Sequence, residues 1–307
     1  MFGKCKDLLG IRFLPACEIT EILEQAEYFK RTVLLTDSKK TNVLSGKNVN
    51  ILFYENSTRT RTSFEMAAKI MGASVCCTAA SSSSVKKGES LVDTVKTLDS
   101  MGPDIIIIRH GMSGAVNLAA EAASASVINA GDGMCEHPTQ ALLDAFTIKE
   151  VKGTLSGLKV AIVGDIAFSR VARSNIWLLR KMGAEVFVSG PSTLIPPFIE
   201  DMGAVSVRSV REAVTGADVV IALRIQVERQ KDCFFPSLHE YASFFGLNDE
   251  VFSYADKEAV LLHPGPVNRG VELTSSLADS CRSCINLQVT NGVAVRMAVM
   301  QKALIRG

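Results

Sequence analysis

Residues 53–65 read Phe-Tyr-Glu-Asn-Ser-Thr-Arg-Thr-Arg-Thr-Ser-Phe-Glu and mark the passage from a strand to a helix. The mainly apolar run 49–54 predicts a buried strand, and the apolar residues from Phe64 to Met71 fall at helical spacing. Ser57 is a good N-cap, so the next three backbone N–H groups have no acceptor within the helix. With the helix dipole, three hydroxyls and two guanidinium groups nearby, this turn predicts a site for a doubly charged anion.

The alternative for this turn is an ordinary helix cap followed by two solvated arginines. A capping serine or threonine is by itself usually structural. Arg59 and Arg61, however, are separated by a single threonine inside the first turn of the helix, where their positive charges oppose the helix dipole. We therefore favour the anion site over the plain cap.

Length and composition limit the class of protein. The 307 residues and the 47% hydrophobic content suit two domains with cores of their own. The net charge of +1 argues against nucleic-acid binding through bulk charge. No apolar run approaches the roughly 18 residues of a membrane span, and the amino terminus carries Lys4, Lys6 and Asp7 where a signal peptide would be apolar. We expect a cytoplasmic protein that binds neither nucleic acid nor membrane.

The cysteines favour reduced thiols. Eight cysteines in a chain of this length do not make a disulfide framework, and Cys281 and Cys284 form a single C-x-x-C without a second pair. We predict mostly buried, reduced thiols and no metal site.

From residue 49 onward, apolar strand-like runs alternate with helical patterns. This alternation predicts an α/β protein of two domains, each a parallel β-sheet flanked by helices, with the active site in the cleft between them. A final amphipathic helix is expected over 292–305. The predicted division is a first domain of residues 1–135 plus a C-terminal helix 288–307, a linking helix 136–149 and a second domain 150–287.

Polar side chains follow one predicted strand after another. In parallel sheets the carboxyl ends of the strands meet at one edge, where ligands bind. One such residue alone is more often structural than catalytic, but six successive strand ends favour a shared site. These strand ends carry Glu55 with Ser57 to Arg61, Arg109-His110, Asn129 to Asp132 with His137 to Gln140, Gly164-Asp165 with Arg170, Arg224 to Gln226, and His263 to Pro266.

Two common nucleotide sites are excluded by sequence. Gly164 opens no G-x-G-x-x-G fingerprint and the chain contains no G-x-x-x-x-G-K-[ST] loop, so a nicotinamide enzyme or an ATPase is not expected. The segment 81–90 is rich in serine and carries Lys86 and Lys87. Its composition is typical of a solvated connector, yet its two lysines offer a movable positive charge that suits closing over an anion.

Five motifs together resemble the catalytic chains of the aspartate carbamoyltransferases. Two of them are shared with ornithine carbamoyltransferases and concern carbamoyl phosphate, while the Lys-Lys-Gly-Glu loop and the Arg-x-Gln-x-x-Arg segment favour aspartate. The His-Cys-Leu-Pro element of ornithine enzymes is missing, and no Ser-Met-Gly element occurs in the second predicted domain. The motifs run in order over nearly the whole chain: Ser57 to Arg61, Val85 to Glu89, His137 to Gln140, Arg224 to Arg229 and His263 to Pro266.

The resemblance implies transfer of the carbamoyl group of carbamoyl phosphate to the amino group of L-aspartate, a step of pyrimidine synthesis that needs no cofactor or metal in this chain. It assigns the phosphate to Ser57, Thr58, Arg59, Thr60 and Arg109, and the developing oxyanion to Thr60, Arg109 and His137. It assigns the carbamoyl NH2 to Gln140, Gly265 and Pro266.

For aspartate, the resemblance implies Arg170 at the α-carboxylate and Arg224 with Gln226 at the β-carboxylate, assisted by Lys87. Ser83 and Lys87 are expected to reach a neighbouring subunit, which implies a homotrimer with shared sites and allows larger assemblies with regulatory or dihydroorotase chains. We further expect Glu55 to bridge to Arg170 and Arg229 when the domains close.

The chain departs from the family pattern after His263. Gly265 and the residues 267–270 replace a leucine and a following arginine of some members, although the backbone carbonyl role of Gly265 and Pro266 survives. Two alternatives stay open: a carbamoyltransferase for another amine such as ornithine, and a non-catalytic phosphate-sensing protein on the same fold.

Overall fold

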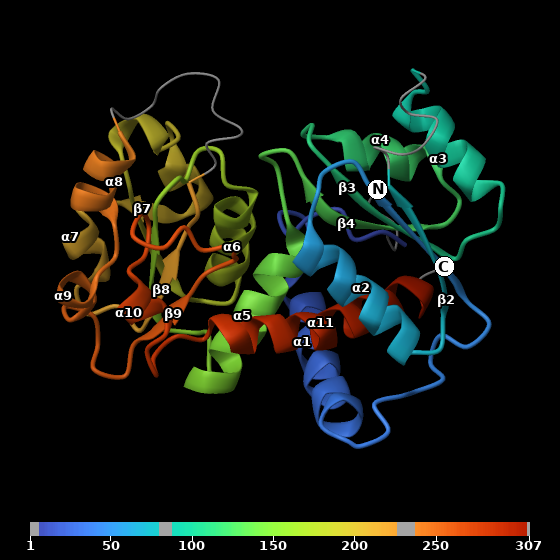
Figure 1. The fold of residues 1–307 in the computed structure, drawn as a ribbon, viewed down its shortest axis with the longest axis horizontal. Helices are drawn as coiled ribbons and strands as arrows, with labels where there is room; N and C mark the ends of the chain where they lie inside the picture. Colours follow the sequence, from blue (N-terminus) through green and yellow to red (C-terminus); the bar gives the residue numbers. More distant parts are fainter. Residues whose placement is uncertain (1–5, 80–87, 226–236, 306–307) are drawn as a thin grey trace. The chain divides into compact units, whose positions relative to one another are not determined.

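The computed structural model describes residues 6–79, 88–225 and 237–305 (Figure 1). The chain divides into two compact units, one of Met1–Phe146 with Val289–Gly307 and the other of Thr147–Gln288. Each unit contains one wholly parallel sheet. The predicted fold class, two domains that each have a parallel sheet flanked by helices, is confirmed.

The first unit has a four-stranded sheet in the order β2-β1-β3-β4. Its elements are α1 (Ala16–Phe29), the π-helix η1 (Lys30–Leu34), β1 (Asn48–Phe53), α2 (Thr58–Ile70), β2 (Ser74–Ala79), α3 (Leu91–Asp99), β3 (Ile105–His110), α4 (Ala115–Ala122) and β4 (Ser126–Asp132). Helix α5 (Pro138–Lys152) leads into the second unit, and α11 (Ile285–Ile305) returns from it.

The second unit has a five-stranded sheet in the order β7-β6-β5-β8-β9. Its elements are β5 (Lys159–Val163), α6 (Arg170–Lys181), β6 (Glu185–Ser189), the 3-10 helices η4 (Ser192–Leu194) and η5 (Ile199–Met202), β7 (Ala204–Ser206), α7 (Val210–Val214), β8 (Val219–Ala222), α8 (Leu238–Phe245), α9 (Asp249–Phe252), β9 (Val260–Leu262) and α10 (Ser275–Ala278).

The first sheet is covered on both faces, which explains its unbroken apolar strands. All four isoleucines of β3, Ile105 to Ile108, are fully buried. Successive side chains of a strand point to opposite faces, and Ile106 and Ile108 pack with residues of α3 and α4 on one face. On the other side, the Ser126 hydroxyl at the start of β4 donates to the Ala303 carbonyl of α11 at 3.0 Å. Helices therefore protect both faces from water.

The second sheet is built in the same way. Residues of β5, β8 and β9 form one apolar cluster with α7, α9 and α10, in which Phe252 is the largest fully buried side chain. The alternate residues Val160 and Ile162 of β5 are also fully buried and point to the opposite face, along which α6 runs (Figure 1).

Two expectations were wrong. The final helix begins earlier than predicted, and it is not amphipathic: seven consecutive residues, 294–300, are buried, which is nearly two turns on every side. Most thiols are not buried either. Among the described cysteines only Cys284 is buried, and Cys77 is half-buried. Four are exposed because they lie on outward positions of helices, loops and the edge strand β2: Cys17, Cys76, Cys135 and Cys281.

In the part of the chain that the structure describes, no helix combines the length and the apolar character needed to cross a membrane.

Candidate active site

Each sheet has a switch point at which the strand order reverses. In the first sheet the chain moves from β1 outward to β2 and then crosses to β3 on the other side of β1. In the second sheet it moves from β5 to β6 and β7 and then crosses to β8. The loops at the carboxyl ends of β1 and β3, and of β5 and β8, therefore run in opposite directions, and such switch points are where α/β proteins bind ligands.

The predicted anion turn lies at the first switch point. Ser57 precedes α2 in an extended conformation, and its side chain makes no capping hydrogen bond. The first backbone bond back to the cap joins the Arg61 N–H to the Ser57 carbonyl at 3.2 Å. The N–H groups of Thr58, Arg59 and Thr60 precede that bond, so they are the donors a helix start offers to an anion.

Arg109 stands beside this turn on the neighbouring strand. It pairs in register with Phe53, the last residue of β1. Its Nε lies 3.2 Å from Oε2 of Glu55, and its Nη1 donates to the Ala130 carbonyl at 3.3 Å. These two contacts orient the guanidinium at the carboxyl-terminal ends of the strands. The ion pair with Glu55 was not predicted from the sequence, which assigned Glu55 to partners in the second domain.

His137 and Gln140 follow β4, the next strand. His137 is 4% exposed and immediately precedes α5, whose first residue is Pro138. The Gln140 N–H donates to the His137 carbonyl at 3.0 Å, and the Gln140 side-chain NH2 donates to Asp144 Oδ1 at 2.9 Å. Because its NH2 is directed at Asp144, the amide of Gln140 turns its oxygen away from Asp144, as an acceptor for a ligand N–H.

A buried carboxylate positions the loop in front of His137. Asp132, 1% exposed, accepts from the Glu136 N–H at 3.1 Å and from the Asn129 NH2 at 3.1 Å through Oδ1. Its Oδ2 accepts from the Gly114 N–H at 2.9 Å. Asp132 thus links the loops that follow β3 and β4. Sequence reasoning placed Asp132 at a strand end but gave it no role, because its partners depend on the fold.

The predicted aspartate residues of the second unit lie at its switch point. Arg170 is the first residue of α6, after β5, and is 3% exposed. Arg224 follows β8, and the Leu223 N–H beside it donates to the Val163 carbonyl of β5 at 2.8 Å. At the end of β5, Gly164 has φ +129° and its added Cβ would lie 2.9 Å from the Leu223 carbonyl oxygen, so only glycine fits.

Pro266 and Gly265 follow β9, the strand next to β8. Gly265 has φ +64°, a left-handed conformation that other residues adopt only under strain. Its N–H donates to Nδ1 of His263 at 2.8 Å.

The described site residues therefore form two groups. Those of the first unit follow the neighbouring strands β1, β3 and β4, and those of the second follow β5, β8 and β9. Four further predicted residues lie outside the described part of the chain: Ser83, Lys87, Gln226 and Arg229.

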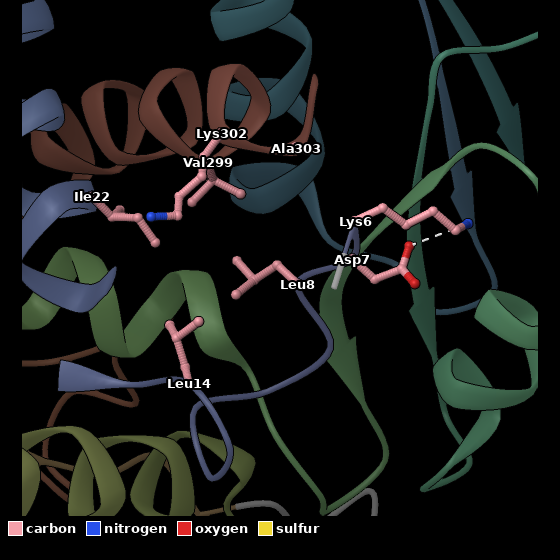
Figure 2. A pocket seen from close by; sticks show the side chains of 8 residues that line it. All are labelled: Lys6, Asp7, Leu8, Leu14, Ile22, Val299, Lys302 and Ala303. Carbon is pink, nitrogen blue, oxygen red and sulfur yellow. Dashed lines mark ion pairs between the residues drawn. The ribbon is translucent and has the colours of Figure 1, made fainter. Parts of the chain in front are cut away.

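Figure 2 shows a small, mainly apolar pocket in the first unit, lined by the amino-terminal segment, α1 and α11. Its two lysines are already engaged: Lys6 donates to the Ala123 and Ala125 carbonyls, and Lys302 pairs with Glu21. The pocket does not lie at the carboxyl ends of the strands, and we do not assign a substrate to it.

Known proteins match the chain over nearly its whole length. Residues 6–150 match the carbamoyl-P binding domain of aspartate/ornithine carbamoyltransferases, and residues 156–303 match their Asp/Orn binding domain. The aspartate carbamoyltransferase catalytic subunit of Ruminiclostridium cellulolyticum is 61% identical over 304 residues, which cover 99% of this chain and 97% of the relative. That of Acetivibrio thermocellus is 60% identical, with 98% and 96% covered.

Solved structures agree with this assignment. Aspartate transcarbamoylase from Trypanosoma cruzi, in complex with N-(phosphonacetyl)-L-aspartic acid, has a TM-score of 0.88 at 29% identity and covers 96% of this chain and 95% of its own. Ornithine carbamoyltransferase from Thermus thermophilus has a TM-score of 0.86 at 29% identity, with 97% and 99% covered. The protein is accordingly a member of the aspartate/ornithine carbamoyltransferase family.

Proposed function

We propose that this chain is the catalytic subunit of an aspartate carbamoyltransferase, which converts carbamoyl phosphate and L-aspartate to N-carbamoyl-L-aspartate and phosphate in pyrimidine synthesis. The observation that carries this proposal is the start of α2 at the first switch point, where the Ser57 side chain makes no capping hydrogen bond and Arg109 is held alongside by Glu55. That arrangement suits a phosphate dianion, which backbone N–H groups, hydroxyls and a guanidinium bind together.

In the proposed reaction, the α-amino nitrogen of aspartate attacks the carbonyl carbon, and the bond from that carbon to the phosphate oxygen breaks. The donors of Ser57, Thr58, Arg59 and Thr60 hold the phosphate and stabilise it as the leaving group. Thr60, Arg109 and His137 donate to the carbonyl oxygen as it becomes negative. The departing phosphate accepts the proton that the amine loses. Positioning and electrostatics supply the acceleration, and no covalent enzyme intermediate is needed.

The carbamoyl NH2 needs acceptors, which the proposal assigns to Gln140 and to the backbone carbonyls of Gly265 and Pro266. The amide oxygen of Gln140 suits this role because its NH2 is already donated to Asp144. Acceptors on the NH2 and donors on the oxygen together distinguish a carbamoyl group from an acetyl group, which lacks the N–H donors.

For the acceptor substrate, the proposal assigns Arg170 to the α-carboxylate and Arg224, with Gln226 and Lys87, to the β-carboxylate. A guanidinium recognises a carboxylate through two parallel hydrogen bonds and rejects an ammonium in its place. This is the physical reason to prefer aspartate over ornithine. The active site would lie in the cleft between the two domains, where Glu55 would bridge to Arg170 and Arg229 on closure.

The proposal also includes a homotrimer in which Ser83 and Lys87 complete the site of a neighbouring subunit, and it allows assembly with regulatory or dihydroorotase chains. A mixture of inactive Lys87→Ala chains and inactive Arg59→Ala chains tests this, because shared sites regain activity in hybrids and separate sites do not.

The free thiols of the described cysteines suit the reducing cytoplasm.

The deciding experiment is a colorimetric assay of carbamoyl-aspartate formation by the purified chain, inhibited by phosphonacetyl-aspartate as a control. L-Ornithine is offered in parallel. Product from aspartate alone supports the proposal. Product from ornithine alone would identify the family's other activity, and no product from either amine would favour a phosphate-binding protein without catalysis.

A further inference from the structure

A set of buried hydrogen bonds connects the turn that follows β9 to the side chains of His263 and Glu272. The ring of His263 accepts the Gly265 N–H at Nδ1, at 2.8 Å, and its Nε2 lies 3.3 Å from Oε1 of Glu272. The same oxygen accepts the Asn268 N–H at 2.6 Å, and the His263 N–H donates to Oε1 of Gln288 at 3.0 Å. His263 and Glu272 are each 2% exposed. The ring therefore joins the two ends of this turn.

The backbone donor settles the tautomer of the ring. The Gly265 N–H is only a donor, so the nitrogen that accepts it, Nδ1, carries no proton. In a neutral ring the proton then resides on Nε2, which points at the Glu272 carboxylate. Glu272 thus favours the one tautomer that leaves Nδ1 free to accept. A ring protonated on Nδ1 would place two donors face to face and release Gly265.

We propose that His263 and Glu272 are positioning residues for the carbamoyl group: Glu272 keeps His263 in the Nε2–H tautomer, and Nδ1 of His263 fixes the backbone of Gly265 and Pro266. This inference rests on the proposed function, in which the carbonyls of that turn accept from the carbamoyl NH2. Neither side chain touches the substrate in this scheme.

The reason such a device is useful lies in the turn itself. Gly265 has φ +64° and lacks a side chain, so packing of its own side chain cannot hold it. A carbonyl that must meet a small substrate needs its direction set to a fraction of an ångström, since a misplacement of about 1 Å can cost roughly 100-fold in rate. The buried ring of His263, which has a hydrogen-bond partner at each nitrogen, supplies that rigidity.

Two substitutions separate the two nitrogens. In His263→Asn the side-chain oxygen lies close to the former Nδ1 and still accepts the Gly265 N–H, whereas in His263→Gln the amide reaches the former Nε2 and leaves Gly265 without its acceptor. We expect kcat/KM for carbamoyl phosphate to fall roughly fivefold in His263→Asn, as for one lost hydrogen bond. In His263→Gln we expect a fall on the order of 100-fold. Thermal unfolding of both variants checks that each is folded.

Equal losses in the two variants, or a greater loss in His263→Asn, overturn the proposal, because a ring that only fills space does not distinguish its nitrogens. The tautomer is measured independently by nitrogen NMR of the unliganded wild-type protein with labelled histidine rings. The chain has 4 histidines, so His263 is assignable by substitution of the others. An unprotonated Nδ1 with a protonated Nε2 supports the proposal, and a proton on Nδ1 overturns it.

These outcomes remain separate from the proposed function. If the wild-type chain formed no carbamoyl-aspartate, the proposed function would fail while the NMR experiment still decided the tautomer. If the wild type is active and the two variants behave alike, only the positioning role fails.

Discussion

Substituting Arg109 by lysine keeps the positive charge but removes the planar guanidinium group. The Nε of the guanidinium lies 3.2 Å from the Glu55 carboxylate, and its Nη1 donates to the Ala130 carbonyl at 3.3 Å, so the planar group is oriented at two of its nitrogens. A lysine ammonium is a single compact charge on a flexible stem. It can pair with Glu55 or with a ligand, but it cannot hold both in the planar arrangement of the guanidinium.

The contacts give the size of each effect. The ion pair is partly exposed, with side-chain exposures of 14% for Arg109 and 24% for Glu55. Its loss should lower the free energy of unfolding by only about 1–2 kcal/mol, near the lower end for hydrogen bonds between charged groups. Loss of one preorganised donor to the oxyanion costs roughly 100- to 1000-fold in kcat, or about 2.7–4 kcal/mol. The effect on catalysis should therefore exceed the effect on stability.

The assay compares kcat/KM for carbamoyl phosphate, by product formation, with the unfolding midpoint in urea. Arg180→Lys is the matched control, because the Arg180 guanidinium also donates to a backbone carbonyl, that of Ala184 at 2.8 Å, but at the far end of α6. We expect at least a 100-fold loss for Arg109→Lys and no more than about a twofold loss for the control. A loss of less than about threefold in Arg109→Lys would refute the role of the planar guanidinium.

Three further predictions concern other parts of the site. Asp132→Asn turns an NH2 toward N–H groups whose hydrogen bonds Asp132 now accepts. It should lower the free energy of unfolding by about 3 kcal/mol, and a urea titration that shows a loss of less than about 1 kcal/mol would contradict the proposed hydrogen-bond network. Burial lowers the pKa of His110, against the opposing effect of the Glu55 carboxylate. The neutral ring of His110 therefore stabilises the fold above pH ~6.5, and this contribution is lost as the pH falls below that value. The urea midpoints at pH 7 and pH 5 should differ less in His110→Asn than in the wild type. An unchanged difference would contradict this role of His110. Arg224→Gln should raise KM for aspartate on the order of 100-fold, and an equal rise for carbamoyl phosphate would show that Arg224 is not specific to the amino acid.

Elements with a strong local sequence pattern could be predicted from the sequence. The β-branched run Ile105 to Ile108 forms β3, and Pro138 begins α5. Each of these elements carries its own signal: β-branched residues in an unbroken run, or a residue that favours a helix start. The polar residues at strand ends follow, because strand direction alone places them at one edge.

Other elements escape prediction for identifiable reasons. Helix α1 has an apolar face in Ile19, Ile22, Leu23 and Ala26, but the alternation of strands and helices that predicts the fold begins only at residue 49. Strand β7 has only three residues at a sheet edge, too few to show an alternation. The ion pair of Glu55 with Arg109 depends on the register between β1 and β3, which the sequence does not reveal.

The most direct test of the account is a crystal structure of the chain with phosphonacetyl-aspartate. We predict that the phosphonate binds the N–H groups of Thr58 to Thr60 and the Arg109 guanidinium, and that the two carboxylates bind Arg170 and Arg224. A phosphonate bound away from the start of α2, with Arg109 and Arg224 both directed elsewhere, would contradict it.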